Sequence, residues 1–396
     1  MKFLLMNMRT RNKINNEQSP IDPKMYTRQK SDIFGLSAKA KYKSFWLRED
    51  GYIEVIDQTK LPFTYETIVL ASSDDTYFAI KDMIIRGAGV IGNIGAFGVY
   101  LAALESGGEK NYTRDKAIKL SNARPTAVNL DWAIKRMLRI LELNPENLVE
   151  ALKKEAISIC EEEKENSDLI GKHGFTIIEK ILKVKNTNRI NILTHCNAGY
   201  LAIIDSGSAL APIYEAKKNG IDVHVWVDET RPRNQGSNLT AWELANENID
   251  FTLIADNTGG LLMQKGEVDL VFVGSDRVTR KGDVANKIGT YLKALAAYDC
   301  NVPFYALFPS STFDMNAMNG LDDIEIELRD EDEMKFNIGL DKKGNLISIK
   351  TVMDNVKVIN YGFDITPSRL ITGLITERGI CKPNREEIEK EFFDLI

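Results

Sequence analysis

Two side chains, Cys196 and Asp276, stand where they could do acid–base chemistry. Cys196 follows the apolar run 190–194, and Asp276 follows the apolar run 268–273. Short runs of this kind are typical of buried strands, and α/β sheets bind ligands at the carboxyl ends of their strands. We therefore expect both groups at one edge of a sheet, where a thiol and a carboxyl group that face each other could act as an acid–base pair.

Both residues also have ordinary structural explanations. A lone cysteine is more often an inert core residue than a reactive one, although a helix amino terminus beside it favours the thiolate. Asp276 precedes a charged turn containing Gly282 and a predicted helix from about Asn286, so it could simply cap that helix. His195 does not supply a Cys–His pair, because neighbouring residues of an extended chain point to opposite faces, and this argues against a cysteine protease.

A glycine-rich segment, Arg86–Gly92, fits the dinucleotide pattern GxGxxG through three of its residues. That pattern needs a strand before it and a second, acid-ended strand after it. Here residues 75–86 have helical spacing, with Asp74 as the expected cap, and a small-residue helix follows. The alternative is that the glycines expose backbone N–H groups at a helix start, which together with Arg86 suit a single phosphate.

Two further segments carry candidate anion-binding groups. Arg124 precedes a predicted helix that starts near Pro125, and Gln235 lies in the polar loop 228–236 with two arginines. Arg124 could also be an ordinary surface arginine, and the loop could be held by internal salt bridges.

Regular alternation of strands and helices begins at about residue 188 and predicts right-handed βαβ units with a parallel sheet. The strand-like runs are 190–194, 223–227, 251–255, 270–273 and 304–308. Polar residues follow each of them: Cys196-Asn197, Asp228-Glu229, Asp256-Asn257, Ser275-Asp276 and Ser310-Ser311. These groups should therefore converge on one edge of the sheet, the expected site of an α/β fold.

Composition limits the function classes. The chain has 396 residues, 43% hydrophobic and 27% charged, with a net charge of -6, which gives no reason to expect a nucleic-acid partner. No run looks long and apolar enough to cross a bilayer, and the first six residues are too short for a signal peptide. The four cysteines are scattered and the histidines number three, so neither a disulfide framework nor a metal site is expected. We expect a reduced, cytoplasmic protein.

The pattern divides the chain into three parts. Residues 1–42 are a polar extension, and residues 43–183 form a smaller mixed α+β domain with a hairpin around 49–51 and helical periodicity over 131–183. Residues 188–396 form the α/β catalytic domain. Its segment 315–358 is acidic with a hairpin signal at 341–345, and a final helix is expected to run to Gly379.

Taken together, these segments resemble the methylthioribose-1-phosphate isomerase family, in a superfamily shared with regulatory subunits of the eukaryotic initiation-factor exchange factor. The resemblance covers roughly residues 45–385. The matching segments are Arg86–Ala88, Ala123–Leu130, Thr194–Gly199, Val227–Arg233, Gly282–Tyr291 and Phe363–Pro367.

The resemblance implies a cofactor-free aldose–ketose isomerase of methionine salvage, with a Rossmann-like catalytic domain, usually a homodimer. It implies catalytic roles for Cys196 and Asp276. It also implies substrate and phosphate contacts from Arg86, Gly87, Ala88, Arg124, Gln235, Asn286 and Lys287. A protonated Asp276 would open the sugar ring, and Cys196 would then carry a proton from C2 to C1, with a direct hydride shift as the competing route.

Departures from the family pattern leave other functions open. Gly89 replaces a proline of the family motif, Tyr361-Gly362 replaces the usual Pro-Ala, and the acidic segment is longer. An isomerase of 5-deoxyribose 1-phosphate or ribose 1,5-bisphosphate would look similar. A non-catalytic, protein-binding member of the superfamily and a nicotinamide enzyme are the alternatives from other classes, and retention of Cys196 and Asp276 argues against the former.

Overall fold

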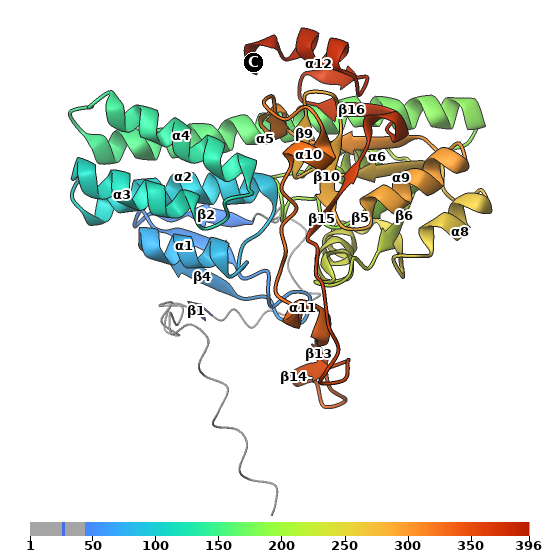
Figure 1. Ribbon diagram of the computed structural model, residues 1–396, viewed down its shortest axis with the longest axis horizontal. Helices are drawn as coiled ribbons and strands as arrows, with labels where there is room; N and C mark the ends of the chain where they lie inside the picture. The colour runs from blue at the N-terminus through green and yellow to red at the C-terminus, as the bar shows by residue number, and fades with distance from the viewer. Residues whose placement is uncertain (1–25, 28–43, 396) are drawn as a thin grey trace, which may run out of the picture.

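The computed structural model describes residues 26–27 and 44–395 (Figure 1), so most of the predicted extension 1–42 lies outside the described residues. The first sheet is antiparallel in the order β1-β4-β3-β2, with β1 at Tyr26–Thr27, β2 at Phe45–Leu47, β3 at Ile53–Ile56 and β4 at Thr67–Leu70. Strands β2 and β3 pair antiparallel around Gly51, which confirms the predicted hairpin.

Five helices accompany this sheet in the described chain. They are α1 (Ser73–Lys81), α2 (Ala88–Glu105), α3 (Lys110–Ser121), α4 (Val128–Glu142) and α5 (Leu148–Lys185). The expected cap Asp74 is wrong, because Ser72 caps α1 and forms a reciprocal capping box with Asp75. The predicted helical region 131–183 is divided between α4 and α5.

Helix α2 corrects the expectation that no segment could cross a membrane. Its 18 residues pass that test by length and mean hydropathy, but 83% of them are buried inside the protein. The small side chains of α2 let α4 approach closely: a Cβ at Gly92 would lie 2.9 Å from the carbonyl oxygen of Asn129. We therefore assign α2 to the core of the first half of the molecule.

The second half is built on a seven-stranded sheet in the order β17-β16-β11-β8-β5-β6-β7, parallel except for β17 at one edge. The strands are β5 (Arg189–His195), β6 (Asp222–Asp228), β7 (Asp250–Ile254), β8 (Leu270–Val273), β11 (Phe304–Leu307), β16 (Gly373–Thr376) and β17 (Gly379–Cys381). Connecting helices include α6 (Ala211–Lys218), α7 (Ala241–Asn246), α8 (Gly259–Gln264) and α9 (Thr290–Asp299). The five predicted strands and the α/β class are confirmed.

Two predicted helices are wrong. The segment around Asn286 is strand β10 (Val284–Lys287), which pairs with β9 (Arg277–Thr279) and with β15 (Phe363–Thr366). A fourth strand, β12 (Phe313–Asp314), completes this sheet. The expected helix up to Gly379 is strand β16, and the last α-helix is α12 (Arg385–Glu391).

The acidic segment leaves the body of the molecule and returns to it (Figure 1). It contains the short helices α10 (Gly320–Asp323) and α11 (Asp332–Lys335) and the predicted hairpin, β13 (Phe336–Leu340) with β14 (Leu346–Lys350).

Helix α5 joins the two halves. Its first part, with Leu152 and Ile159, packs in the core of α1–α4. Its second part, with Ile170 and Ile178, packs in the core beneath β5 and β6. The predicted boundary at residues 183–188 coincides with the end of α5, yet the helix belongs to both cores (Figure 1).

Candidate active site

One cavity brings together all nine residues predicted as site residues. It lies where the carboxyl ends of β5 and β8 meet the start of α2. Its walls include Arg86, Gly87, Ala88, Arg124, Cys196, Gln235, Asp276, Asn286 and Lys287. Cys196 and Asp276 therefore line the same cavity, although 80 positions separate them, and both are partly exposed to it.

The backbone of Cys196 is held in a rarely adopted conformation, with φ at 68°. The Cys196 N–H donates to Thr230 Oγ1 at 2.9 Å, and Thr240 Oγ1 donates to the Cys196 carbonyl at 2.7 Å. Asp256 in turn accepts the N–H groups of Thr230 and Arg231, at 2.7 and 2.8 Å. A cysteine in the left-handed backbone region, fixed by hydrogen bonds at both its N–H and its carbonyl, is typical of a functional position.

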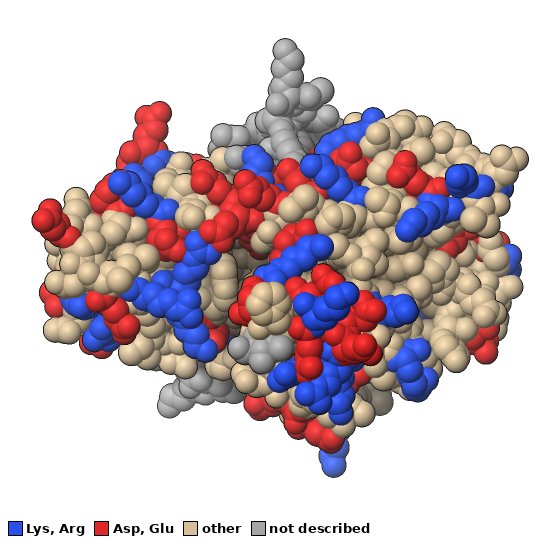
Figure 2. All heavy atoms as spheres, turned by 90° about the horizontal axis from the view of Figure 1, so that it is seen from above, with Lys and Arg blue, Asp and Glu red and all other residues tan. Residues whose placement is uncertain are grey.

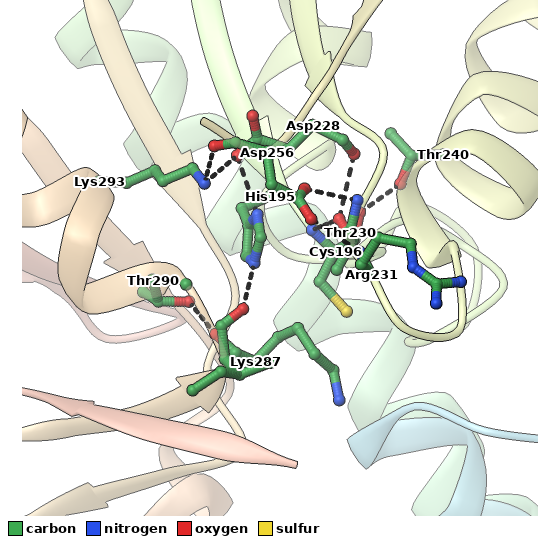
Figure 3. Close-up of polar contacts among 12 residues, drawn as sticks. His195, Cys196, Asp228, Thr230, Arg231, Thr240, Asp256, Lys287, Thr290 and Lys293 are labelled. Carbon is green, nitrogen blue, oxygen red and sulfur yellow. Dashed lines mark hydrogen bonds and ion pairs between the residues drawn. The ribbon is translucent and has the colours of Figure 1, made fainter. Parts of the chain in front are cut away.

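His195 points away from the neighbouring sulfur, as predicted (Figure 3). Its Nδ1 lies 2.8 Å from Asp228 Oδ2, and its Nε2 lies 2.9 Å from the carbonyl oxygen of Ile288. Both ring nitrogens are therefore engaged by oxygen atoms of neighbouring residues. The imidazole thus joins the end of β5 to the segment after Lys287 instead of acting on the thiol.

A cluster of possible metal ligands lies behind Cys196. Side-chain ligand atoms of His195, Asp228 and Asp256 lie within 4.8 Å of one another. However, the Lys293 ammonium is 3.2 Å from Asp228 Oδ2 and also donates to the Asp256 carbonyl (Figure 3). Because the Lys293 ammonium already pairs with the Asp228 carboxylate of this cluster, we assign the cluster to charge pairing and not to metal binding.

The start of α2 is shaped by Gly87, whose φ is 103°. A Cβ on this residue would lie 2.4 Å from Ala202 Cα, so only glycine fits. Helix α1 and not a strand precedes this segment, so the strand–turn–helix context of a dinucleotide site is missing here. Arg86 is 8% exposed and donates to the Asn197 carbonyl at 3.1 Å.

The side chain of Glu243 holds the loop after Cys196 in place through hydrogen bonds. Its buried carboxylate accepts from Asn197 Nδ2 at 2.8 Å, from the N–H groups of Tyr200 and Leu201, and from the Tyr214 hydroxyl. Burial raises the pKa of Glu243 to about 7, against the opposing effect of these donors. Because Asn197 also binds Arg86, Glu243 fixes the arginine and the cysteine loop relative to each other.

Asp276 does not cap a helix. Its N–H donates to the Ala285 carbonyl at 3.0 Å, within the turn from β8 to the β9–β10 pair. Asn286 and Lys287 reach the cavity from β10, where Lys287 Nζ donates to the Gly362 carbonyl at 3.0 Å and lies 4.9 Å from the centre of the Phe363 ring. The pKa of Lys287 is lowered to about 8, chiefly by burial and next by Arg329 and Arg124, against the opposing effect of Cys196 and Asp276.

The cavity residues that the sequence analysis missed as site residues include Arg329 and Phe363. Arg329 comes from the acidic segment, which the motifs leave out. Residues Glu327 and Arg329 alternate with the exposed Leu328, and this period-two pattern is the signal that could have placed both on one face of an extended chain.

The cationic lining of the cavity is a local feature. Figure 2 shows Lys and Arg interspersed with Asp and Glu over the face seen from above, without a broad patch of one sign. In the cavity, by contrast, Arg86, Arg124, Lys287 and Arg329 face a single acidic lining residue, Asp276. Such a site suits a small anion placed beside a thiol and a carboxyl group.

Comparisons with known proteins agree with this arrangement. Residues 85–383 match the Initiation factor 2 subunit family. A methylthioribose-1-phosphate isomerase from Sulfurimonas denitrificans is 54% identical over 357 residues, covering 89% of this chain and 99% of the relative. Among solved structures, 5-methylthioribose 1-phosphate isomerase from Pyrococcus horikoshii has a TM-score of 0.77 at 33% identity, covering 92% of this chain and 100% of that one. The translation initiation factor eIF-2B, subunit delta, from A. fulgidus has a TM-score of 0.74 at 37% identity, covering 88% and 98%. The chain therefore belongs to the Initiation factor 2 subunit family and, within it, to the methylthioribose-1-phosphate isomerases.

Proposed function

We propose that this protein is an aldose–ketose isomerase that converts 5-methylthioribose 1-phosphate to 5-methylthioribulose 1-phosphate, a step of methionine salvage. The observation that carries the proposal is the shared cavity, in which Cys196 and Asp276 lie among the cationic side chains. Relatives that bear the name of this enzyme at 47–54% identity support it.

An adjoining hollow supports an apolar substituent at C5 of the sugar. It shares Asp276 and Arg124 with the cavity, and its lining includes the apolar Ile91, Val128 and Ile324 beside Glu325. Its other arginine, Arg277, is already paired with Asp314 at 3.3 Å. A thioether or methyl group matches such a surface better than the second phosphate of a bisphosphate does.

In the proposed mechanism, Asp276 opens the ring. A sugar phosphorylated on its anomeric oxygen has no free aldehyde, so a protonated Asp276 first donates to the ring oxygen as the C1–oxygen bond breaks. Cys196, as the thiolate, takes the proton from C2 and returns it to C1, while Asp276 recovers a proton from the C2 hydroxyl. No atom or charge is gained or lost over the cycle, so both residues return to their starting states.

Three sugar 1-phosphates test the proposal: those of methylthioribose, 5-deoxyribose and ribose 5-phosphate. We expect the highest kcat/KM with the methylthio sugar, and turnover of none of the three would refute the function. The same reaction in deuterated water distinguishes the routes. Deuterium at product C1 supports proton transfer by Cys196, and its absence under conditions that exclude shielded transfer supports the hydride shift.

A binding role is the second candidate, since a solved structure of similar fold carries the name of an initiation-factor subunit. The presence of both Cys196 and Asp276 in one cavity favours catalysis, and an inactive chain would favour binding. We further propose that residues 188–396 form a Rossmann-like catalytic domain and that the protein acts as a cytoplasmic homodimer without a cofactor. A thermal shift with NAD would overturn the cofactor-free assignment.

A further inference from the structure

The acidic segment contributes an ion-pair network to the cavity that the motifs do not include. Glu327 Oε2 lies 3.3 Å from an Arg124 nitrogen and 3.2 Å from an Arg329 nitrogen. The side chains are 24%, 12% and 7% exposed for Glu327, Arg124 and Arg329, so the network is largely buried. One carboxylate therefore holds two guanidinium groups at the cavity wall.

Backbone pairing fixes where this network sits. Arg329 N–H donates to the Asn360 carbonyl and Gly362 N–H donates to the Glu327 carbonyl, both at 2.9 Å. The Arg329 guanidinium lies 5.2 Å from the centre of the Phe363 ring, which also lies beside Lys287. A Cβ at Gly362 would lie 2.8 Å from Arg329 Nε, so glycine leaves the room that the arginine fills. Arg329 is thus placed by several contacts and is not a loose surface cation.

Positively charged side chains predominate in this corner of the cavity. The pKa values of Arg124 and Lys287 are both lowered. Burial is the larger cause, and the nearby charge of Arg329 is the next. The pKa of Glu327 is lowered despite its burial, because Arg329 and Arg124 stabilise its carboxylate. Arg124, Lys287 and Arg329 outnumber the carboxyl groups of Glu327 and Asp276, which leaves capacity for an anion, and guanidinium groups bind phosphate through paired N–H donors.

We propose that Arg329 is a further substrate-binding residue that contacts the sugar phosphate, and that Glu327 holds Arg124 and Arg329 in place while competing with the phosphate for them. This inference rests on the proposed function for the identity of the substrate, but not for the binding of inorganic phosphate. It assigns the acidic segment a direct part in the site.

The test compares the full-length protein with Arg329→Gln, Glu327→Gln and a control, Arg280→Gln. Arg280 also pairs with a carboxylate, that of Glu389, but does not line the cavity. Binding of inorganic phosphate is measured by calorimetry, and KM and kcat are measured with methylthioribose 1-phosphate. Thermal melting of each variant checks that it is folded.

The two variants should act in opposite directions. Arg329→Gln should weaken phosphate binding and raise KM about tenfold or more, with kcat changed only a few-fold, since a charge-assisted contact is lost from ground state and transition state alike. Glu327→Gln should tighten phosphate binding several-fold, because it keeps an acceptor for the guanidinium groups while removing the competing charge. Arg280→Gln should leave both values unchanged.

Unchanged phosphate binding in Arg329→Gln would overturn the inference. Weaker phosphate binding in Glu327→Gln would also overturn it, because simple damage to packing would weaken phosphate binding in both variants. If Arg329→Gln does not fold, the result for Glu327→Gln decides. If phosphate binding changes as expected but no sugar phosphate is isomerised, the proposed function fails alone. If isomerisation is normal and phosphate binding is insensitive to Arg329, this inference fails alone.

Discussion

Replacing Glu163 by glutamine should stabilise the protein at alkaline pH and leave its stability near pH 5 almost unchanged. Glu163 lies on α5, is 9% exposed and packs against the first turn of α2. The Asn93 amide donates to its Oε2. Burial raises the pKa of Glu163 from 4.5 to about 8, so the folded protein holds this carboxyl group in its neutral form at neutral pH.

The magnitude follows from proton linkage. The unfolded chain releases this proton near pH 4.5 and the folded chain near pH 8, so between these values the folded state binds more protons. The free energy of unfolding therefore falls as the pH rises through this window. At about 1.4 kcal/mol per pKa unit, the loss between pH 5 and pH 8 is about 3–4 kcal/mol. Water that enters the adjoining cavity, which Asn93 and Asn129 also line, would reduce this value.

Thermal or urea unfolding of wild type and Glu163→Gln at pH 5 and pH 8 provides the measurement. Glutamine mimics the protonated acid and does not titrate, so the variant should lose the part of the pH dependence that Glu163 causes. Glu162→Gln is the matched control, since Arg136 lowers the pKa of that more exposed neighbour and no alkaline gain is expected. The reasoning is wrong if wild type and Glu163→Gln show the same change in stability between the two pH values.

Three further predictions concern the site and its support. Cys196→Ser and Asp276→Asn should each lower kcat by about 10²–10⁴ with little change in KM, measured by steady-state kinetics, because the phosphate contacts remain; near-normal kcat in either variant would remove that residue from the mechanism. Gly89→Ala places a Cβ 1.7 Å from Glu163 Oε1 and should lower the free energy of unfolding by about 1–3 kcal/mol. In a double-mutant cycle, adding Glu163→Ala should restore most of this stability, and additive effects would contradict the contact. His195→Asn keeps a donor for Asp228 but loses the bond to the Ile288 carbonyl, so it should lower Tm and kcat and leave the pH optimum of the reaction unchanged. A shifted pH optimum would instead indicate that the imidazole acts directly as an acid or base.

Local sequence predicts five of the six parallel strands, because each of the five is a short, largely apolar run between turn signals, whereas β16 was predicted as part of a helix. Of the five polar pairs expected at one edge of the sheet, Cys196-Asn197 and Ser275-Asp276 line the cavity and the other three do not. The residues Val284–Lys287 carry no such signal. Their strand is decided by pairing with Phe363–Thr366, almost 80 positions later, and such non-local pairing overrides local preference.

The position of Arg329 has the same origin. The alternation around Leu328 places Glu327 and Arg329 on one face, but nothing in this acidic segment indicates that this face meets the cavity. Its place at the cavity depends on the bridge between Leu328 and Tyr361, which forms only when the returning chain lies alongside. The cap of α1 was misplaced for a simpler reason, since Ser72 and Asp74 are both good caps and only the Asp75 side chain, which bonds back to Ser72, decides between them.

Because α5 runs through both hydrophobic cores, neither half of the molecule can melt while the other stays intact. Loss of the first core would free one end of this 38-residue helix and remove support from the other end. We therefore expect one cooperative thermal transition and slow amide exchange along the middle of the helix. A substitution that disrupts the buried apolar side chains of α5, such as Ile159 or Ile178, would then reduce the amount of active protein without changing the chemistry.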